Sequence, residues 1–535
     1  MNEIKLERKK AYKNTDPMTT VNRIRQILYK NNIFVIEVSQ KIEPVTGVCS
    51  CRIILGDESV RSLNIGSNGK GMNAQYSLAS AYAEFMERLQ NGATLWKVLG
   101  ITDYMVRSRD YSREQMIGFA EEMFKRAYDP SENYHDIATA YIDSGNYREA
   151  VVFDEVNGQG KITVPSGLFN KMTGSNGMAA GNTYKEAIIQ GLSEIFERYA
   201  ISKMFLEEIT PPTVCEDIFN ETDVIKRLKR LKIVGVNYKI LDCSLGINIP
   251  VLALLIEKGG KYHIHYGADP SPITALERCL TEIFQGRNIE ELPLYEPYYE
   301  KDDLQKKFKN EEKEYTDSTG KVPAWIIENE PTYSFEGFIH PVTVSDDDDL
   351  SFYIRILDSL GKKLYVRDCG YLGFPTVRLY VPGMTENHCP SPEDCISAKT
   401  EEDIVQAVRR LPSLSEDEVM RLCDKIGSTI NLAQMLPPGD FPGRRWDDRQ
   451  FKAAILIKAG QTKAGMELLD SYIADNYMTE KQAELMKLHF KIKKVLFRRN
   501  EWPDCPDCDT CSAVRKCKKE EVETLDKALC NLLSQ

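Results

Sequence analysis

The sequence predicts an α+β protein in which a unit of strands and a helix occurs twice, followed by an all-helical, tetratricopeptide-like C-terminal region. The triplet Ser-Asn-Gly precedes a helix with an acidic stripe in both halves, at Ser67 and at Ser175. Short runs of β-branched and aromatic residues, typical of strands, accompany both helices. Beyond residues 437–443, which are rich in Pro and Gly, apolar residues recur at helical spacing. The internal repeat indicates two half-sites that face one cleft.

The first unit begins with a short amphipathic helix and two strands, expected at residues 20–30, 33–38 and 52–55. Residues 67–71, Ser-Asn-Gly-Lys-Gly, are expected to form a loop that could cradle phosphate, although they lack the GxxxxGK[ST] spacing of a P-loop. The first acidic helix is predicted at about residues 75–90. The stretch 100–150 is charged and rich in Tyr, so we expect an irregular insertion or a peripheral subdomain there.

The second unit starts with a Gly-rich loop at residues 175–181, and its acidic helix begins at Asn182 or Thr183. Further strands are predicted at residues 238–241, 250–256, 262–265, 363–367 and 375–382. Residues 296–330 are dominated by Lys, Glu and Asp, which favours a surface excursion. The charge run from Asp346 to Asp349 is expected to be a solvated loop.

The C-terminal part contains two helical patterns, at residues 451–460 and 464–473, that predict a hairpin of the tetratricopeptide kind. One such pair buries too little apolar surface alone, so we expect it to dock on the main domain. The tail carries four thiols, at Cys505, Cys508, Cys511 and Cys517. Their spacing is typical of a tetrahedral Zn²⁺ site or an iron–sulfur cluster, between which it does not decide. The alternative is a polar tail that happens to be rich in Cys.

Composition limits the classes of partner and compartment. The net charge of -11 over 535 residues argues against a broad nucleic-acid interface. No apolar run approaches the ~18 residues of a membrane span, and the first thirty residues do not resemble a signal peptide. The 14 cysteines would normally be reduced thiols in such a chain. We therefore expect a cytoplasmic protein with no nucleic-acid or membrane partner.

Three predicted helices carry polar stripes among apolar residues, with carboxylates at Glu84, Glu87, Glu194, Glu197 and Glu282. Helices that are apolar almost all round are buried, and aligned buried carboxylates repel each other unless cations or hydrogen bonds compensate. Five carboxylates exceed the charge that one ion balances, so we expect two or more Mg²⁺ ions and a phosphorylated ligand. Arg88, Arg198 and Arg278 could clamp phosphate oxygens, or could instead pair with neighbouring carboxylates.

The same residues resemble the signature of a known family. Residues 175–198 contain Ser175-Asn-Gly-Met-Ala-Ala-Gly-Asn182-Thr followed by Glu186-x-x-x-Gln190-x-x-x-Glu194-x-x-Glu197-Arg198, which looks like the YcaO signature. Residues 69–88 and 275–287 are similar to two further motifs of that family, in the same order. The similarity covers roughly residues 10–400.

The resemblance implies a YcaO-like fold around a cleft for ATP and Mg²⁺. It implies that the five glutamates hold Mg²⁺. It implies nucleotide contacts by Lys13, Thr20, Lys70, Ser80, Ser175, Asn182, Glu186, Gln190, Arg198 and Arg278. Family members use ATP to activate a backbone amide, so no catalytic residue is expected beyond the ATP and Mg²⁺ site.

The pattern is closest to the enterobacterial YcaO type, whose members are accessory factors for ribosomal-protein methylthiotransferase. The chain ends without the Pro-rich tail of azoline-forming members, so we expect thioamidation or an allied modification of a peptide or protein. The alternative is a non-catalytic accessory protein that uses nucleotide as a switch and recruits a sulfur-delivery or methylthiotransferase partner. An amide-bond ligase is a third reading. A homodimer is a further expectation.

These inferences divide the chain into four parts. We expect a YcaO-like ATP-binding domain at residues 1–400, with its peripheral region at about 100–150. A helical connection and linker at 401–448 leads to a tetratricopeptide-like helical region at 449–500 and a Cys-rich tail at 501–535.

Overall fold

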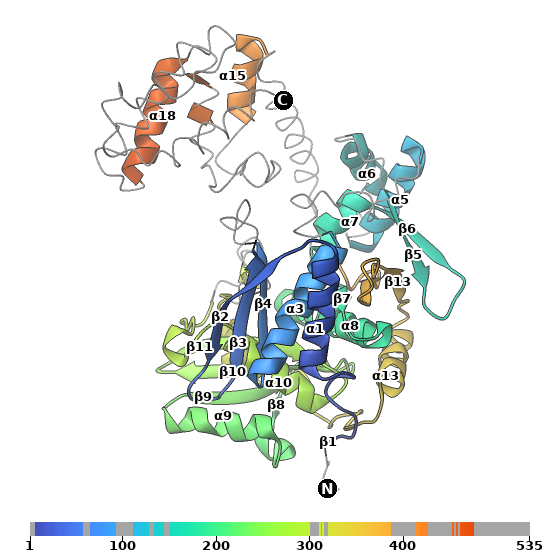
Figure 1. Ribbon diagram of the computed structural model, residues 1–535, viewed down its shortest axis with the longest axis vertical. Helices are drawn as coiled ribbons and strands as arrows, with labels where there is room; N and C mark the ends of the chain where they lie inside the picture. Colours follow the sequence, from blue (N-terminus) through green and yellow to red (C-terminus); the bar gives the residue numbers. More distant parts are fainter. Residues whose placement is uncertain are drawn as a thin grey trace.

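The computed structural model describes residues 6–56, 65–92, 111–127, 133–143, 150–299, 310–311, 313–314, 319–386, 414–425, 452–453, 456–457 and 461–475. Helices and strands mix throughout the described part of residues 6–386, which confirms the α+β class (Figure 1). None of the helices in these described ranges is long and apolar enough to cross a membrane.

The first sheet holds the N-terminal unit. Its strands, in the order β2-β3-β4, are β2 (Val35–Ile42), β3 (Cys49–Leu55) and β4 (Gly66–Gly71), all antiparallel. Helices α1 (Pro17–Lys30) and α3 (Ala74–Gln90) lie side by side along this sheet (Figure 1). Ile24 of α1, Ile53 of β3 and Phe85 of α3 share one core, so the helix that carries the first acidic stripe is fixed to the sheet.

The second sheet has the order β11-β10-β9-β8 and is buried on both faces. Its strands are β8 (Thr213–Val214), β9 (Asn237–Asp242), β10 (Val251–Lys258) and β11 (Lys261–Ala268). Helices α9 (Asp223–Ile233) and α10 (Pro272–Ile283) pack on one face with Leu252 and Leu254, while α8 (Tyr184–Glu207) shares the other core with Ala253. Burial on both faces explains why β10 is a continuous apolar run.

The third sheet joins the two halves of the chain. Its order is β6-β5-β13-β14-β7, with β6 (Lys161–Pro165), β5 (Ala150–Glu155), β13 (Tyr365–Asp368), β14 (Thr376–Tyr380) and β7 (Met178–Ala180). A parallel pair of β1 (Glu7–Arg8) and β12 (Val342–Thr343) ties the N-terminus to the segment before α13 (Asp346–Ser359). The remaining helices are α5 (Arg113–Ala127), α6 (Tyr134–Asp143), α7 (Ser166–Thr173), α12 (Ala324–Glu328), α15 (Glu416–Lys425) and α18 (Thr462–Asp475).

The internal repeat relates β4 and α3 to β11 and α10. Gly69 of β4 lies against α3 so closely that a Cβ there would be 2.6 Å from Ala81 N, and a Cβ on Gly267 of β11 would be 2.9 Å from Cys279 N of α10. In both copies the helix atom comes twelve residues after the glycine. The sequence predicted a repeat around α3 and α8, whereas these glycine spacings match α3 with α10, and α8 follows the short strand β7 of the five-stranded sheet.

Several local predictions were wrong. Residues 67–71 form part of strand β4 and not a loop, because their backbone pairs with β3; a phosphate contact there stays a prediction. The described part of 100–150 is regular, because α5 and α6 pack around a core that includes Phe124 and Tyr141, and the peripheral subdomain stays a prediction. The segment 296–330 contributes Trp325, which is 1% exposed, to the main core.

The run from Asp346 to Asp349 begins helix α13 instead of forming a solvated loop. Ser345 caps the helix by accepting a hydrogen bond from Asp348 N at 3.2 Å. Carboxylates are favourable in the first turn because they face the positive end of the helix dipole. Asp349 is fully buried, where its carboxylate pairs with Lys10.

The C-terminal predictions are only partly covered. α18 contains the predicted segment 464–473, and residues 452–453 and 456–457 of the first predicted helix are helical. The tetratricopeptide-like arrangement stays a prediction. Cys505, Cys508, Cys511 and Cys517 lie outside the described residues.

Candidate functional site

Lys70 on β4 lies among carboxylates from three helices. Its Nζ forms an ion pair with Glu282 of α10. The charges of Glu84 on α3 and of Glu197 and Glu194 on α8 also act on it, while burial lowers the pKa of the Lys70 ammonium. The three predicted stripes therefore converge on one place, as the sequence predicted.

Two arginines accompany the stripes. Arg88 Nη1 lies 3.5 Å from Glu87 Oε1, and Arg88 Nε lies 4.0 Å from Glu84 Oε1. On α8, Arg198 Nε lies 4.0 Å from Glu194 Oε1. Both arginines thus neighbour carboxylates of their own helices. Lys70, Arg88 and Arg198 pair with these carboxylates, and the charges of two further arginines, Arg278 and Arg378, act on Glu197 and Glu87.

Burial makes this carboxylate cluster costly to ionise. It raises the pKa of Glu87 to about 8, and the nearby Glu194 and Glu84 charges add to the rise. Burial is also the first cause of the raised pKa of Glu84 and of Glu197. Clustered carboxylate oxygens that are costly to ionise suit a hard divalent cation, which would stabilise their ionised form. The residues present therefore fit Mg²⁺.

A pocket lies next to the cluster, since Glu197 acts on Arg278, and is lined by Lys13, Glu186, Gln190 and Arg278, among others. Arg278 Nη2 donates hydrogen bonds to Gln190 Oε1 at 2.8 Å and to Asp269 Oδ2 at 3.0 Å. Arg278 Nε is buried and has no hydrogen-bond partner among the described residues. A guanidinium with a donor to spare fits an anionic ligand.

Glu186 connects the N-terminal segment to the start of α8. Its carboxylate lies 3.6 Å from Lys13 Nζ and accepts from Asn182 Nδ2 at 3.2 Å. Thr20 Oγ1 donates to Asn182 Oδ1 at 2.8 Å, so Lys13, Thr20, Asn182 and Glu186 form one chain of contacts. Four of the predicted nucleotide-contacting residues, two from the N-terminal segment and two from the start of α8, are therefore brought together.

Two predicted residues lie outside these contacts. Ser175 is in the turn between α7 and β7, where its carbonyl accepts from Met178 N at 3.0 Å. Ser80 is half-buried on α3, one turn before Glu84, so it belongs to the acidic stripe.

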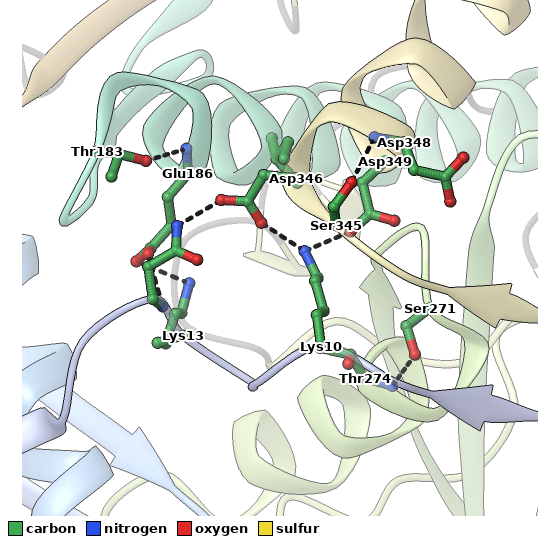
Figure 2. A network of polar contacts seen from close by, with 12 residues as sticks. Lys10, Lys13, Thr183, Glu186, Ser271, Thr274, Ser345, Asp346, Asp348 and Asp349 are labelled. Carbon is green, nitrogen blue, oxygen red and sulfur yellow. Dashed lines mark hydrogen bonds and ion pairs between the residues drawn. The ribbon is translucent and has the colours of Figure 1, made fainter.

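Sequence reasoning missed two residues that line this pocket, Lys10 and Asp346. Figure 2 shows Lys10 facing Asp346 and Asp349, with Lys10 Nζ 2.7 Å from Asp346 Oδ1. Asn14 also donates to Asp346, at 2.5 Å. The clustered Lys and Asp residues were visible signals, but only folding brings positions 10 and 346 together.

A family model described as "YcaO cyclodehydratase, ATP- and Mg²⁺-binding" matches residues 68–385. The chain belongs to the YcaO family. Each acidic stripe lies within the matched residues. The convergence of the stripes on Lys70 and the family's description thus concern the same part of the molecule.

Two curated relatives extend the YcaO match. The ribosomal protein S12 methylthiotransferase accessory factor YcaO of Escherichia coli is 28% identical over 372 residues, which cover 66% of this chain and 62% of that protein. An uncharacterized protein of Haemophilus influenzae is 28% identical over 374 residues, with the same two coverages. The chain thus spans 62% of the length of these relatives.

Two solved structures match at lower sequence identity. YcaO from Methanopyrus kandleri, bound with AMPPCP and Mg²⁺, matches with a TM-score of 0.44 and 18% identity, over 70% of this chain and 92% of that one. A heterocyclase in complex with substrate and cofactor matches with a TM-score of 0.46 and 20% identity, over 70% of this chain and 53% of that one.

Proposed function

We propose that this protein uses ATP and Mg²⁺ to activate a backbone amide of a peptide or protein for a modification of the thioamidation type. The observation that carries the proposal is the convergence of carboxylates from α3, α8 and α10 on Lys70. Membership of a family described as ATP- and Mg²⁺-binding supports the choice of cofactors. Bound ATP and Mg²⁺ would supply the phosphoryl group and neutralise its charge.

The chain's own residues would bind and orient these cofactors. Glu84, Glu87, Glu194, Glu197 and Glu282 would hold Mg²⁺. Arg278 would use its remaining donor on a phosphate oxygen, while Gln190 and Asp269 hold its guanidinium in place. Lys13, Thr20, Asn182 and Glu186 would line the other end of the nucleotide. Such positioning and charge neutralisation are the main requirements of phosphoryl transfer.

The test is Mg²⁺-dependent nucleotide binding. The purified protein should bind a non-hydrolysable ATP analogue only with Mg²⁺, and Glu194→Ala with Glu197→Ala should abolish this binding. The matched control is Glu121→Ala with Glu122→Ala on α5, which removes the same charge from outside the site. Binding without Mg²⁺, or unchanged binding by the α8 double variant, would refute the site.

A second function is favoured by the name of the Escherichia coli relative: a nucleotide-binding accessory factor for methylthiolation of a ribosomal protein. Measurements of ATP hydrolysis distinguish the enzyme from the accessory factor. ATP hydrolysis that a peptide stimulates, with the mass gain of an oxygen-to-sulfur exchange, supports the enzyme. Hydrolysis that no peptide stimulates, together with stable capture of a purified methylthiotransferase, supports the accessory role.

We also propose a Zn²⁺ site or an iron–sulfur cluster at Cys505, Cys508, Cys511 and Cys517, on their spacing alone. Metal analysis of the wild-type protein and of Cys508→Ser tests this proposal. If the two proteins contain the same amounts of zinc and of iron, the proposal is refuted. The free thiols of Cys49, Cys51 and Cys243 accord with a reducing compartment, and we propose the cytoplasm.

A further inference from the structure

A buried imidazole lies directly behind the Glu282 carboxylate. His265 is on β11, and its Nε2 is 3.9 Å from Glu282 Oε2. On the other side of the ring, His265 Nδ1 is 3.7 Å from Glu314 Oε1. The three side chains therefore form a row in which the imidazole separates two carboxylates.

This row lies in the interior. The side chain of Glu314 is 2% exposed and that of His265 is 10% exposed, whereas Glu282 is 23% exposed. Burying two carboxylates and an imidazole beside one another costs free energy of folding unless hydrogen bonds or ion pairs compensate. Side-chain exposure increases from Glu314 to Glu282, so the row leads from the core to the proposed metal site around Lys70.

The two oxygens of Glu282 have different neighbours. Oε1 is ion-paired with Lys70, and Oε2 faces His265. The separation of 3.9 Å between Nε2 and Oε2 is longer than a hydrogen bond. A ring N–H that closes this distance when a cation binds would fix one carboxylate oxygen and leave the other for the cation. Partners of this kind behind metal ligands typically change metal affinity by about 10–100-fold when removed.

We propose that His265, backed by Glu314, is a positioning residue that orients the Glu282 carboxylate toward Mg²⁺. The inference rests on the proposed function, since it takes Glu282 as a metal ligand. It goes beyond that proposal by assigning a role to two residues outside the acidic stripes, one of them in the segment 296–330.

The same strand provides a matched control. His263 lies two residues before His265, so both side chains point to the same face of β11. His263 is fully buried, and neither of its ring nitrogens has a hydrogen-bond partner among the described residues. If a buried imidazole on this face served packing alone, substitutions at the two positions would have the same effects.

The experiment measures the Mg²⁺ concentration that gives half-maximal binding of a non-hydrolysable ATP analogue, together with thermal unfolding of each variant. We expect His265→Phe to raise this concentration about 10–100-fold. His265→Gln, which keeps an N–H donor, should recover part of the loss, and Glu314→Gln should cause a smaller rise. His263→Phe should leave the Mg²⁺ requirement unchanged even where it lowers the unfolding temperature.

The outcomes separate this inference from the proposed function. Wild-type protein that binds the analogue without any Mg²⁺ requirement refutes the proposed function and the inference with it. Wild-type protein that requires Mg²⁺, with His265 and Glu314 variants that require no more, refutes the inference alone. Equal rises for the His263 and His265 variants also refute it, because they indicate a packing effect. Should His265→Phe not fold, His265→Gln and Glu314→Gln decide.

Discussion

Arg278 on α10 donates a hydrogen bond to Gln190 on α8, with 2.8 Å between Nη2 and Oε1. The bond joins two of the three helices that carry the acidic stripes, and Asp269 at 3.0 Å fixes the same nitrogen. The guanidinium is thereby oriented before any ligand arrives, with Nε still to be satisfied. Preorganised donors of this kind lower the cost of binding an anion.

Arg278→Lys should therefore weaken nucleotide binding even though it keeps the charge. A lysine ammonium cannot contact Gln190, Asp269 and a phosphate oxygen in one plane. Loss of a hydrogen bond to a charged group costs about 1.5–3 kcal/mol, so we expect about a tenfold or larger rise in the Kd for an ATP analogue. The control is Arg230→Lys on the exposed side of α9. Equal affinities for wild type and Arg278→Lys would contradict the assignment.

Mg²⁺ binding should release a proton from Glu87. Its folded pKa of about 8 means that the carboxyl is mostly protonated at pH 7 without metal, and a metal ligand must be ionised. Calorimetric titrations in two buffers of different ionisation enthalpy should show up to about one proton released at pH 7 and less at pH 9. Glu87→Gln should remove this release. A proton count that is the same in wild type and variant would exclude Glu87 as its source.

The metal-free protein should lose stability as the pH rises toward 8. A carboxyl whose pKa is raised from 4.5 in the unfolded chain to about 8 in the fold contributes stability that is complete below the lower value. The contribution is lost as the pH rises through the upper value. Denaturant unfolding of wild type between pH 5 and pH 9 should show this decline, and Glu87→Gln should flatten it. A wild-type stability that increases over this range would contradict the burial of this group.

Lys70→Met should strengthen the binding of Mg²⁺ alone. Lys70 is ion-paired with Glu282 and so competes with a metal ion for that carboxylate. Removing the ammonium leaves the cluster more negative, and we expect about a tenfold lower Kd for Mg²⁺ by calorimetry without nucleotide. The exposed Lys203→Met on α8 is the control. Unchanged or weaker Mg²⁺ binding would show that Lys70 does not compete for the site.

The parts of the site that are local in sequence could be predicted. Glu84 and Glu87 recur at helical spacing, as do Glu194 and Glu197, and a helix turns such spacing into one stripe without any help from the rest of the fold. The contacts that depend on distant segments could not be predicted. Lys10 meets Asp346 only because β1 pairs with β12, which no periodicity records.

The Ser-Asn-Gly-Lys-Gly segment shows why local chemistry can mislead. Its glycines predicted a loop that could cradle phosphate, yet the backbone of residues 67–71 pairs with β3 as a strand. Gly69 allows β4 and α3 to approach closely, and Gly267 allows the same between β11 and α10. Glu84 and Glu282 each follow their glycine by fifteen residues, so the repeat places equivalent carboxylates on the two helices.

Gly69→Ala should destabilise the protein and loosen the metal site together. A Cβ at position 69 would lie 2.6 Å from Ala81 N, and backbone at this distance cannot yield as a flexible side chain can. Forcing the helix and strand apart should lower the free energy of unfolding by about 1–3 kcal/mol and raise the Mg²⁺ requirement for nucleotide binding, because Glu84 and Lys70 are carried by these two elements. Gly267→Ala should act in the same way through Glu282.

The control is Gly118→Ala in the exposed part of α5, where nothing lies within 4 Å of the new Cβ. That substitution should stabilise the helix by roughly 0.5–1 kcal/mol and leave Mg²⁺ binding unchanged. Denaturant unfolding and nucleotide titration of the three variants check this, and a Gly69→Ala protein as stable as wild type would mean that β4 and α3 do not approach as closely as described.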